Sequence, residues 1–213
     1  MAKNYITEFI GTFFLVFTIG MCVTTGQPLA PLAIGSALMV MVYMGGHISG
    51  GHYNPAVTLA VFLRGKIAGR EAGAYMLMQL CGAIVAALLV FWLTGGKTFA
   101  PEPSTEMTKM GAATAEFVFT FALALVVLNT ATVTKTAGNS YFGLAIGFTV
   151  AVGVFAVGGL SGGAFNPAVG SGPAIVRALL AGGPLGQVWY YLVAQFVGGA
   201  AAAGVFKMQN PGD

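Results

Sequence analysis

The chain contains the same nine-residue stretch twice, with two substitutions. Residues 49–57 read Ser-Gly-Gly-His-Tyr-Asn-Pro-Ala-Val, and residues 161–169 read Ser-Gly-Gly-Ala-Phe-Asn-Pro-Ala-Val. The two asparagines, Asn54 and Asn166, are 166 − 54 = 112 residues apart, which is about half of the chain. Self-similarity on this scale indicates an internal duplication. We therefore expect a fold built from two related halves.

The composition predicts a membrane protein. Of the 213 residues 57% are hydrophobic and only 7% are charged, whereas a soluble domain carries roughly 25% charged residues. The first apolar run, about residues 5–24, is too long for a cleaved signal core, so we interpret it as a retained span. The net charge of +3 is small and dispersed, which argues against a nucleic-acid partner. Cys22 and Cys81 lie in apolar runs, and we expect them to pack without forming a disulfide.

Six apolar runs are long enough to cross a hydrocarbon core of about 30 Å as helices. They lie near residues 5–24, 29–46, 70–94, 111–133, 140–159 and 185–207. Two further apolar segments, 54–63 and 166–179, follow the repeated motif and are each about half as long as a span. Segments of that length are expected to re-enter the membrane rather than cross it.

The basic residues predict an orientation in which both termini are cytoplasmic, with the plasma (inner) membrane as the expected location. The positive-inside rule places the more basic set of loops in the cytoplasm. The cytoplasmic set is Lys3, Arg64, Lys66, Arg70, Lys135 and Lys207, and the external set is Lys97, Lys109 and Arg177. In this orientation the residues expected to form an aromatic belt at the outer interface are Trp92, Trp189, Tyr190 and Tyr191.

The two halves also match outside the motif. Gly35 and Gly147 each lie 19 residues before the motif asparagine and are expected to pack closely where two helices cross. Glu8 and Glu116 each lie in the first helix of their half. We therefore predict one all-α transmembrane domain over residues 1–213, with six transmembrane helices and two re-entrant half-helices arranged as an inverted repeat. The first repeat covers about 1–96 and the second about 110–208.

The Asn-Pro-Ala triplets have a physical rationale at the start of each half-helix. Asparagine is a good N-cap, and proline suits the first turn because its missing N–H would be unpaired there. Each helix N-terminus carries about +0.5 elementary charge, so two such ends meeting at the bilayer midplane repel cations and protons. The residues expected at this midplane are Asn54, Pro55, Ala56, Asn166, Pro167 and Ala168.

These features resemble the aquaporins, the major intrinsic protein family. Residues 46–58, Gly-His-Ile-Ser-Gly-Gly-His-Tyr-Asn-Pro-Ala-Val-Thr, are similar to the first family signature. Residues 165–168 match the second, and residues 8–12, Glu-Phe-Ile-Gly-Thr, resemble the signature of the first helix. The resemblance covers nearly the whole chain. It implies an hourglass fold with one pore per subunit and a homotetramer, without a cofactor.

One departure from the family pattern concerns selectivity. Water and glycerol channels of this family have an arginine directly after the second Asn-Pro-Ala, where this chain has Val169. By the same resemblance, the other three positions of the outer constriction fall on Ile34, Val154 and Gly163. Water-selective members of the family have an aromatic residue and a histidine at the first two of these positions. The resemblance thus implies an apolar constriction, which should weaken selectivity against larger neutral solutes.

Other polar residues have two interpretations each. Glu8 and Glu116 could relay protons in a coupled transporter, or could accept hydrogen bonds from the re-entrant loops; their symmetry favours the second role. His47 and His52 could line the inner vestibule or sense pH, or they could brace the loop by hydrogen bonding. No set of residues indicates an enzyme or a metal site.

The sequence thus predicts a passive channel for water and small uncharged solutes that excludes ions at the paired half-helix ends. One alternative is a neutral-solute or gas channel with low water flux, passing ammonia, urea, glycerol or hydrogen peroxide. A proton-coupled secondary transporter that uses Glu8 and Glu116 is a further alternative.

Overall fold

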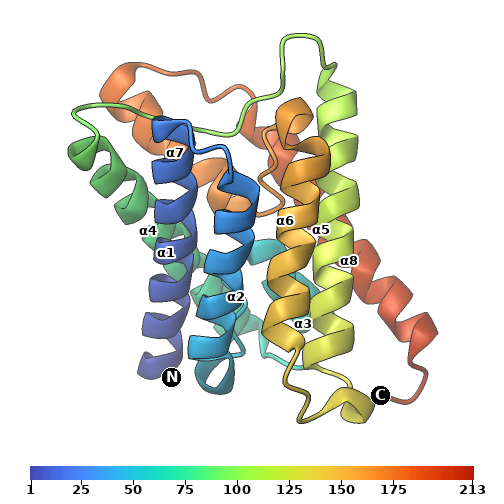
Figure 1. Cartoon of the computed structure of the whole chain (residues 1–213). Helices are drawn as coiled ribbons and strands as arrows, with labels where there is room; N and C mark the ends of the chain where they lie inside the picture. Colours follow the sequence, from blue (N-terminus) through green and yellow to red (C-terminus); the bar gives the residue numbers. More distant parts are fainter.

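The computed structural model describes residues 1–213 and contains helices and loops but no strand. Six helices are long and apolar enough to cross a membrane, which confirms the predicted all-α class and the number of spans (Figure 1). They are α1 (Ala2–Thr25), α2 (Ala30–Ser49), α4 (Gly69–Leu93), α5 (Lys109–Ala131), α6 (Phe142–Ser161) and α8 (Val188–Gln209). The shorter helices are α3 (Pro55–Leu63), α7 (Pro167–Ala181) and the 3-10 turn η1 (Thr134–Thr136).

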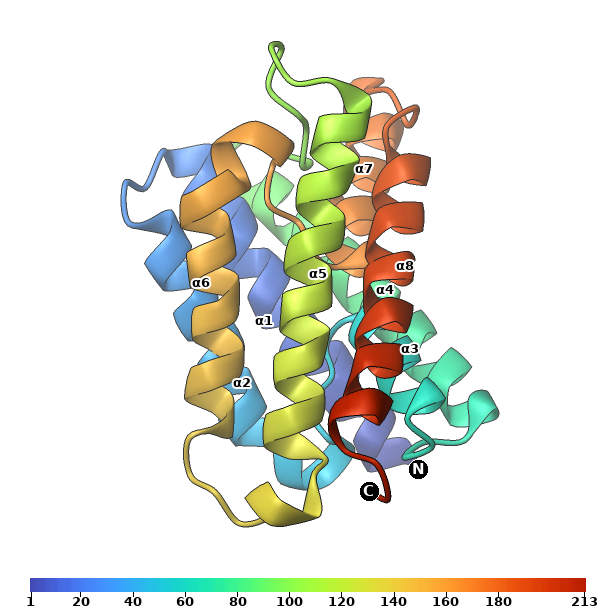
Figure 2. The ribbon, with the colours of Figure 1, turned by 90° about the vertical axis from the view of Figure 1, so that its right-hand side faces the viewer.

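The six long helices form two groups of three, α1, α2 and α4 in the first and α5, α6 and α8 in the second. Helix α1 lies against α4 and α5 lies against α8, while α2 and α6 join the two groups. Both chain termini lie at the same end of the molecule (Figures 1 and 2). We call this end the terminal face, and the end that carries the long α4–α5 loop the opposite face.

The half-helices enter from opposite ends and begin near the middle of the molecule (Figure 2). Helix α3 runs from Asn54 toward the terminal face, and α7 runs from Asn166 toward the opposite face. Helix α7 ends at Ala181, two residues beyond the expected limit, and continues through Pro173. Its chain turns at Gly182, whose φ of 66° is accessible to glycine at little cost.

Glycines allow α2 and α6 to approach closely at their crossing, as the sequence predicted. A β-carbon at Gly35 would lie 2.6 Å from the carbonyl oxygen of Gly147, closer than any real contact. Equivalent close approaches occur at Gly82, against the backbone of Phe9, and at Gly198, against the backbone of Phe117. Backbone-to-backbone packing of this kind is how membrane helices associate without a hydrophobic driving force.

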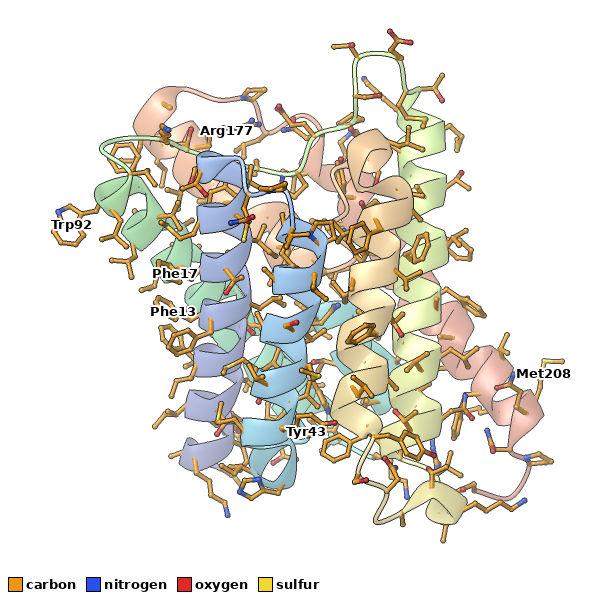
Figure 3. The ribbon with its side chains drawn as sticks, in the orientation of Figure 1. Phe13, Phe17, Tyr43, Trp92, Arg177 and Met208 are labelled. Atoms are coloured by element: carbon orange, nitrogen blue, oxygen red, sulfur yellow. The ribbon has the colours of Figure 1, made fainter.

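The expected aromatic belt was wrong for two of its four residues. Trp92 and Trp189 are 74% and 63% exposed, and Figure 3 shows Trp92 pointing away from α4. Tyr190 and Tyr191 are instead buried, at 5% and 1%. Successive residues of a helix turn by 100°, so three consecutive aromatic residues cannot all face the lipid. Cys22 and Cys81 are both free, as expected.

Candidate functional site

Each motif asparagine caps its half-helix. The Oδ1 atom of Asn54 accepts hydrogen bonds from the backbone N–H groups of Ala56 (2.9 Å) and Val57 (3.4 Å). The Oδ1 atom of Asn166 accepts one from Ala168 (2.9 Å). Both asparagines have extended backbone geometry and are followed by proline at the first helical position. The predicted capping role of both residues is confirmed.

The two motifs are also joined to each other by reciprocal hydrogen bonds. Nδ2 of Asn54 donates to the backbone carbonyl of Phe165, and Nδ2 of Asn166 donates to the carbonyl of Tyr53, both at 2.9 Å. A side-chain amide has two N–H donors, so each asparagine keeps one for another acceptor. The sequence did not predict these bonds, which fix the two half-helix ends relative to each other.

The residues before the asparagines have an unusual backbone conformation. Tyr53 and Phe165 both have φ = 49°, and they are the only non-glycine residues of the chain with positive φ. This left-handed conformation is strained for bulky side chains and costs on the order of 1–3 kcal/mol. It persists here because hydrogen bonds hold both peptide groups of each residue.

Glu8 supplies these hydrogen bonds in the first repeat. Its buried carboxylate accepts from the backbone N–H groups of His52 (3.0 Å) and Tyr53 (2.7 Å). It also accepts from the Ser49 hydroxyl (2.6 Å) and from Nε2 of Gln79 (2.7 Å). Four donors compensate the desolvation of one carboxylate at membrane depth.

Glu116 does the same in the second repeat. Its carboxylate accepts from the N–H groups of Ala164 (3.0 Å) and Phe165 (2.7 Å), from the Ser161 hydroxyl (2.8 Å) and from Nε2 of Gln195 (2.9 Å). Neither Glu8 nor Glu116 lines a cavity along the axis of the molecule. The geometry therefore gives both residues a loop-supporting environment.

Two tyrosines also support the re-entrant loops, a role that the sequence did not predict. The hydroxyl of Tyr75 donates to the carbonyl of Ser49 (2.9 Å), and the hydroxyl of Tyr191 donates to the carbonyl of Ser161. Tyr75 precedes Gln79 by four residues, and Tyr191 precedes Gln195 by four. Comparison of the third helices of the two halves would have shown this match.

Three consecutive cavities form an hourglass through the molecule. A vestibule of about 420 Å³ opens on the terminal face, and one of about 250 Å³ opens on the opposite face. The narrow cavity between them has a volume of only about 20 Å³, little more than one water molecule needs. The narrow cavity shares His52 and Val127 with the terminal vestibule. It shares Ile19, Ile34, Gly163 and Val169 with the opposite one.

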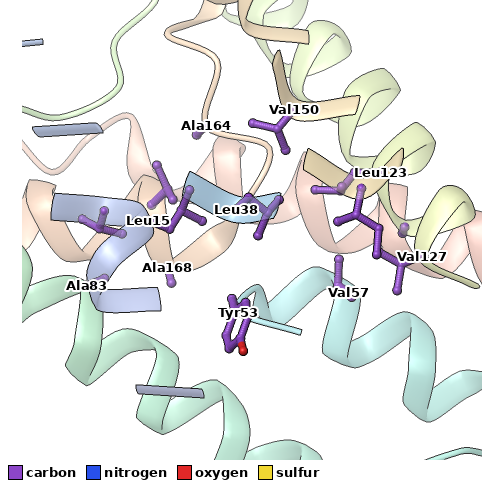
Figure 4. Packing of buried hydrophobic residues seen from close by; sticks show 14 of the residues in the cluster. Leu15, Leu38, Tyr53, Val57, Ala83, Leu123, Val127, Val150, Ala164 and Ala168 are labelled. Atoms are coloured by element: carbon purple, nitrogen blue, oxygen red, sulfur yellow. The ribbon is translucent and has the colours of Figure 1, made fainter. Parts of the chain in front are cut away.

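The narrow cavity is apolar apart from three side chains. Its polar lining consists of His52, Asn54 and Asn166, so both motif asparagines face the space between the vestibules. The apolar lining includes Leu15 and Leu123, which belong to the buried cluster drawn in Figure 4. Hydrogen-bonding side chains are thus confined to the middle of the cavity and to its terminal end.

The four residues expected at the outer constriction lie together. Ile34, Val154, Gly163 and Val169 all line the opposite vestibule, and all except Val154 also line the narrow cavity. Pro101 of the α4–α5 loop joins them, a residue that the sequence analysis missed. That loop is held in place by an ion pair between Glu102 and Arg177, 2.7 Å from Oε1 to Nη2 (Arg177 is labelled in Figure 3).

The two histidines occupy different environments. His47 is exposed in the last turn of α2 and lines none of the three cavities, whereas His52 lies where the narrow cavity meets the terminal vestibule. The Thr58 hydroxyl donates to the carbonyl of Asn54 (3.1 Å) and accepts from Gln79 (3.0 Å). Nδ1 of His52, 3.1 Å from this hydroxyl, is therefore assigned as a donor, which leaves Nε2 as an acceptor.

No three His, Cys, Asp or Glu side chains lie close enough together to hold a metal ion. The site therefore consists of a narrow path, two half-helix ends and a set of hydrogen-bonding groups. In a helical bundle with six membrane spans, these features define a transmembrane channel formed by an inverted repeat.

Comparison with known proteins identifies the kind of channel. The family model of the major intrinsic proteins matches residues 1–206, so the chain belongs to this family. It is 39% identical over 210 residues to the glycerol uptake facilitator protein-like 6 of Lactiplantibacillus plantarum, covering 94% of this chain and 95% of that protein. It is 36% identical to aquaporin NIP1-4 of Oryza sativa subsp. japonica, covering 95% and 75%.

A solved structure shows the same fold. The aquaglyceroporin from Plasmodium falciparum superimposes with a TM-score of 0.86 at 23% sequence identity, covering 96% of this chain and 95% of that chain. The family and the fold together identify a multi-pass membrane protein that acts as a passive channel for water and small uncharged solutes, and not as an enzyme.

Proposed function

We propose that the three consecutive cavities are the permeation path and that Ile34, Val154, Gly163 and Val169 form its selectivity constriction. The main support is that Ile34, Gly163 and Val169 line both the narrow cavity and the opposite vestibule, as Ile19 does, and that Val154 lines the vestibule beside them. Every solute that follows this path must pass between them. Gly163 has no side chain, and the side chains of the other three residues offer neither a charge nor a hydrogen bond.

Ions and protons are excluded mainly at the midplane. The N-terminal ends of α3 and α7 meet there, and both carry partial positive charge. Asn54 and Asn166 each keep one free amide N–H after donating a hydrogen bond to the other motif's loop. A water molecule whose oxygen accepts hydrogen bonds from both asparagines cannot also accept one from the next water molecule. Proton transfer along a row of water molecules in the path is thereby interrupted.

The solutes include small uncharged molecules larger than water. One relative of this chain is named a glycerol uptake facilitator, and the constriction of this chain has no cation or aromatic side chain to narrow it. We therefore propose that glycerol, urea and ammonia pass together with water.

A second candidate, a neutral-solute channel with low water flux, is favoured by the apolar lining at the opposite end of the narrow cavity. Apolar constrictions can lose their water and close by dewetting. The ratio of water to glycerol permeability separates this candidate from the first.

Stopped-flow light scattering on proteoliposomes tests the role of the constriction. Val169→Arg should lower glycerol and urea permeability at least about tenfold while water still passes, because a guanidinium both narrows the path and holds fixed donors. Val169→Leu, which adds only apolar volume, is the matched control. An unchanged solute profile in Val169→Arg would mean that Val169 does not face the path.

We further propose a homotetramer in a plasma (inner) membrane, with the terminal face toward the cytoplasm. The orientation is supported by the distribution of basic residues, six toward the terminal face and three toward the opposite one. Cysteine labelling of Lys3→Cys and Lys97→Cys from one side of intact cells tests the orientation. Cross-linking in the membrane tests the tetramer.

A further inference from the structure

Two apolar grooves flank α8 and meet at one tryptophan. The first, of about 330 Å³, lies between α5 and α8 and is lined by residues such as Ala113, Phe117 and Val193. The second, of about 560 Å³, lies between α4 and α8 with α7 behind it, and is lined by residues such as Leu80. Trp189, at the opposite-face end of α8, lines both grooves.

Both grooves run from the opposite face to the hydrocarbon region. The first extends along α5 from Lys109 to Phe117, a rise of about 12 Å. The second reaches Pro55 and Pro167, the first residues of the two half-helices, which begin near the middle of the molecule. Because the chain spans the membrane, we expect lipid chains to be the medium at this depth.

The grooves have little affinity for water. Thr114 and Tyr190 are the hydroxyl residues of the first groove, and Oγ1 of Thr114 donates to the carbonyl of Met110 at 2.8 Å. Ser171 is the hydroxyl residue of the second, and its Oγ donates to the carbonyl of Pro167 at 2.5 Å. The Thr114 and Ser171 donors are used within their own helices, and Tyr190 lies beside Trp189 at the opposite-face end of α8, so the deeper lining favours hydrocarbon.

An unpaired cation lies at the open end of the first groove. Lys109 forms no ion pair, even with Glu106 three residues before it. The other basic residues of this face are engaged: Arg177 pairs with Glu102, and Nζ of Lys97 donates to the carbonyl of Thr24 (3.2 Å). Lys109 is thus available to an anion at the level where lipid headgroups lie.

We propose that these features form a binding site for one anionic phospholipid that straddles α8. Its phosphate pairs with Lys109, and its two acyl chains occupy the two grooves on either side of Trp189. Two grooves that meet at one residue beside one free cation match a molecule with one anionic head and two tails. The chain in the second groove would pack behind Pro167 and support the half-helix from the lipid side.

The two tryptophans of the chain allow a direct test. Trp92 and Trp189 are both exposed near the opposite face, but Trp92 lines neither groove. Trp92→Phe leaves Trp189 as the only tryptophan, and Trp189→Phe leaves Trp92 as the matched control. Each variant is reconstituted in phosphatidylcholine with increasing small fractions of phosphatidylglycerol brominated on its acyl chains, and fluorescence quenching is recorded.

We expect brominated phosphatidylglycerol to quench Trp189 at about fivefold lower mole fraction than Trp92, the factor that corresponds to one basic residue at an anionic lipid surface. Lys109→Gln in the Trp92→Phe background should remove this preference. Ala113→Phe, which fills the first groove, should weaken quenching of Trp189 only.

Three results would overturn the proposal. Equal quenching of both tryptophans, unchanged by Lys109→Gln, would mean ordinary bulk lipid around α8. Equally strong quenching of Trp189 by brominated phosphatidylcholine would mean that the site does not prefer an anionic headgroup. Quenching of Trp92 alone would show that a neighbouring copy of the chain covers the grooves. Each readout is independent of permeation, so the test stands apart from the proposed solute path.

Discussion

Asn54 and Phe165, 111 residues apart, are joined by a 2.9 Å hydrogen bond from the Asn54 amide to the Phe165 carbonyl. The reciprocal bond from Asn166 to Tyr53 has the same length. Each asparagine therefore caps its own half-helix through Oδ1 and holds the other loop through Nδ2. The strained conformations of Tyr53 and Phe165 turn their carbonyls to accept these bonds. Their N–H groups donate to Glu8 and Glu116.

Replacing one asparagine by aspartate separates these two roles. Asn54→Asp keeps an acceptor for the Ala56 N–H but loses the donor to Phe165, and it places a carboxylate in the narrow cavity. A negative charge there offsets the positive half-helix ends, so we expect a cation or proton leak. Loss of the buried bond should also lower stability by about 1–3 kcal/mol.

A pH-sensitive dye trapped in proteoliposomes measures the leak. Asn139→Asp is the control, because Asn139 also donates to backbone carbonyls, those of Thr130 (2.7 Å) and Thr136 (2.6 Å), in a loop remote from the cavity. A leak of equal size in both variants, or in neither, would contradict an ion barrier at Asn54.

The crossing of α2 and α6 should tolerate no side chain. In Gly35→Ala the new methyl group would lie 2.6 Å from the Gly147 carbonyl oxygen, so the two helices must separate. We expect a loss of about 1–3 kcal/mol in the free energy of unfolding. Unfolding titrations in mixed micelles measure it, with Gly73→Ala as the control because its methyl group would meet no atom within 4 Å. Equal stability of the two variants would argue against close packing at Gly35.

The helix crossing and the caps could be predicted from sequence because they depend on local patterns. Gly35, Gly147 and both Asn-Pro pairs follow from spacing and from helix-terminus chemistry. The hydrogen bonds from Asn54 to Phe165 and from Asn166 to Tyr53 could not be predicted, since they depend on how two loops that are distant in sequence meet in space.

The aromatic belt failed for a related reason. The position of Tyr190 and Tyr191 at the end of a predicted span placed them near a membrane interface. Whether each side chain faces lipid or the protein interior depends on the residues packed against the helix, and both are buried. Tyr191 turns inward because the carbonyl of Ser161 is its acceptor. Tyr75 is the equivalent residue of the first repeat and donates to the Ser49 carbonyl in the same way. Aligning the two repeats would therefore have predicted that Tyr191 faces inward.

The terminal face has a pH-sensitive contact. The backbone N–H of Thr134 donates to Oδ2 of Asp213 (3.0 Å), and Arg64 lies 2.9 Å from Oδ1. These contacts, the Thr134 hydrogen bond foremost, lower the pKa of Asp213 from its ordinary 3.8. A carboxylate with a lowered pKa in the folded state stabilises the fold above the unfolded pKa, and this contribution is lost as the pH falls through the folded value.

Asp213→Asn should therefore be less stable than the wild type by a constant amount well above pH 3.8, and the difference should shrink below that pH. Thermal unfolding in detergent between about pH 6 and pH 3 measures both proteins. A difference that stays the same across this range would exclude ionised Asp213 as the source of the stabilisation.

The most direct test of a passive channel for water and small uncharged solutes is the flux of the wild-type protein itself. Stopped-flow light scattering on proteoliposomes gives water and glycerol permeabilities, each with and without an imposed pH gradient. We expect both solutes to pass above the rate of protein-free vesicles, in linear proportion to their gradients and independently of the pH difference. Glycerol flux that saturates, or that follows the proton gradient, would contradict a passive channel and favour a coupled transporter.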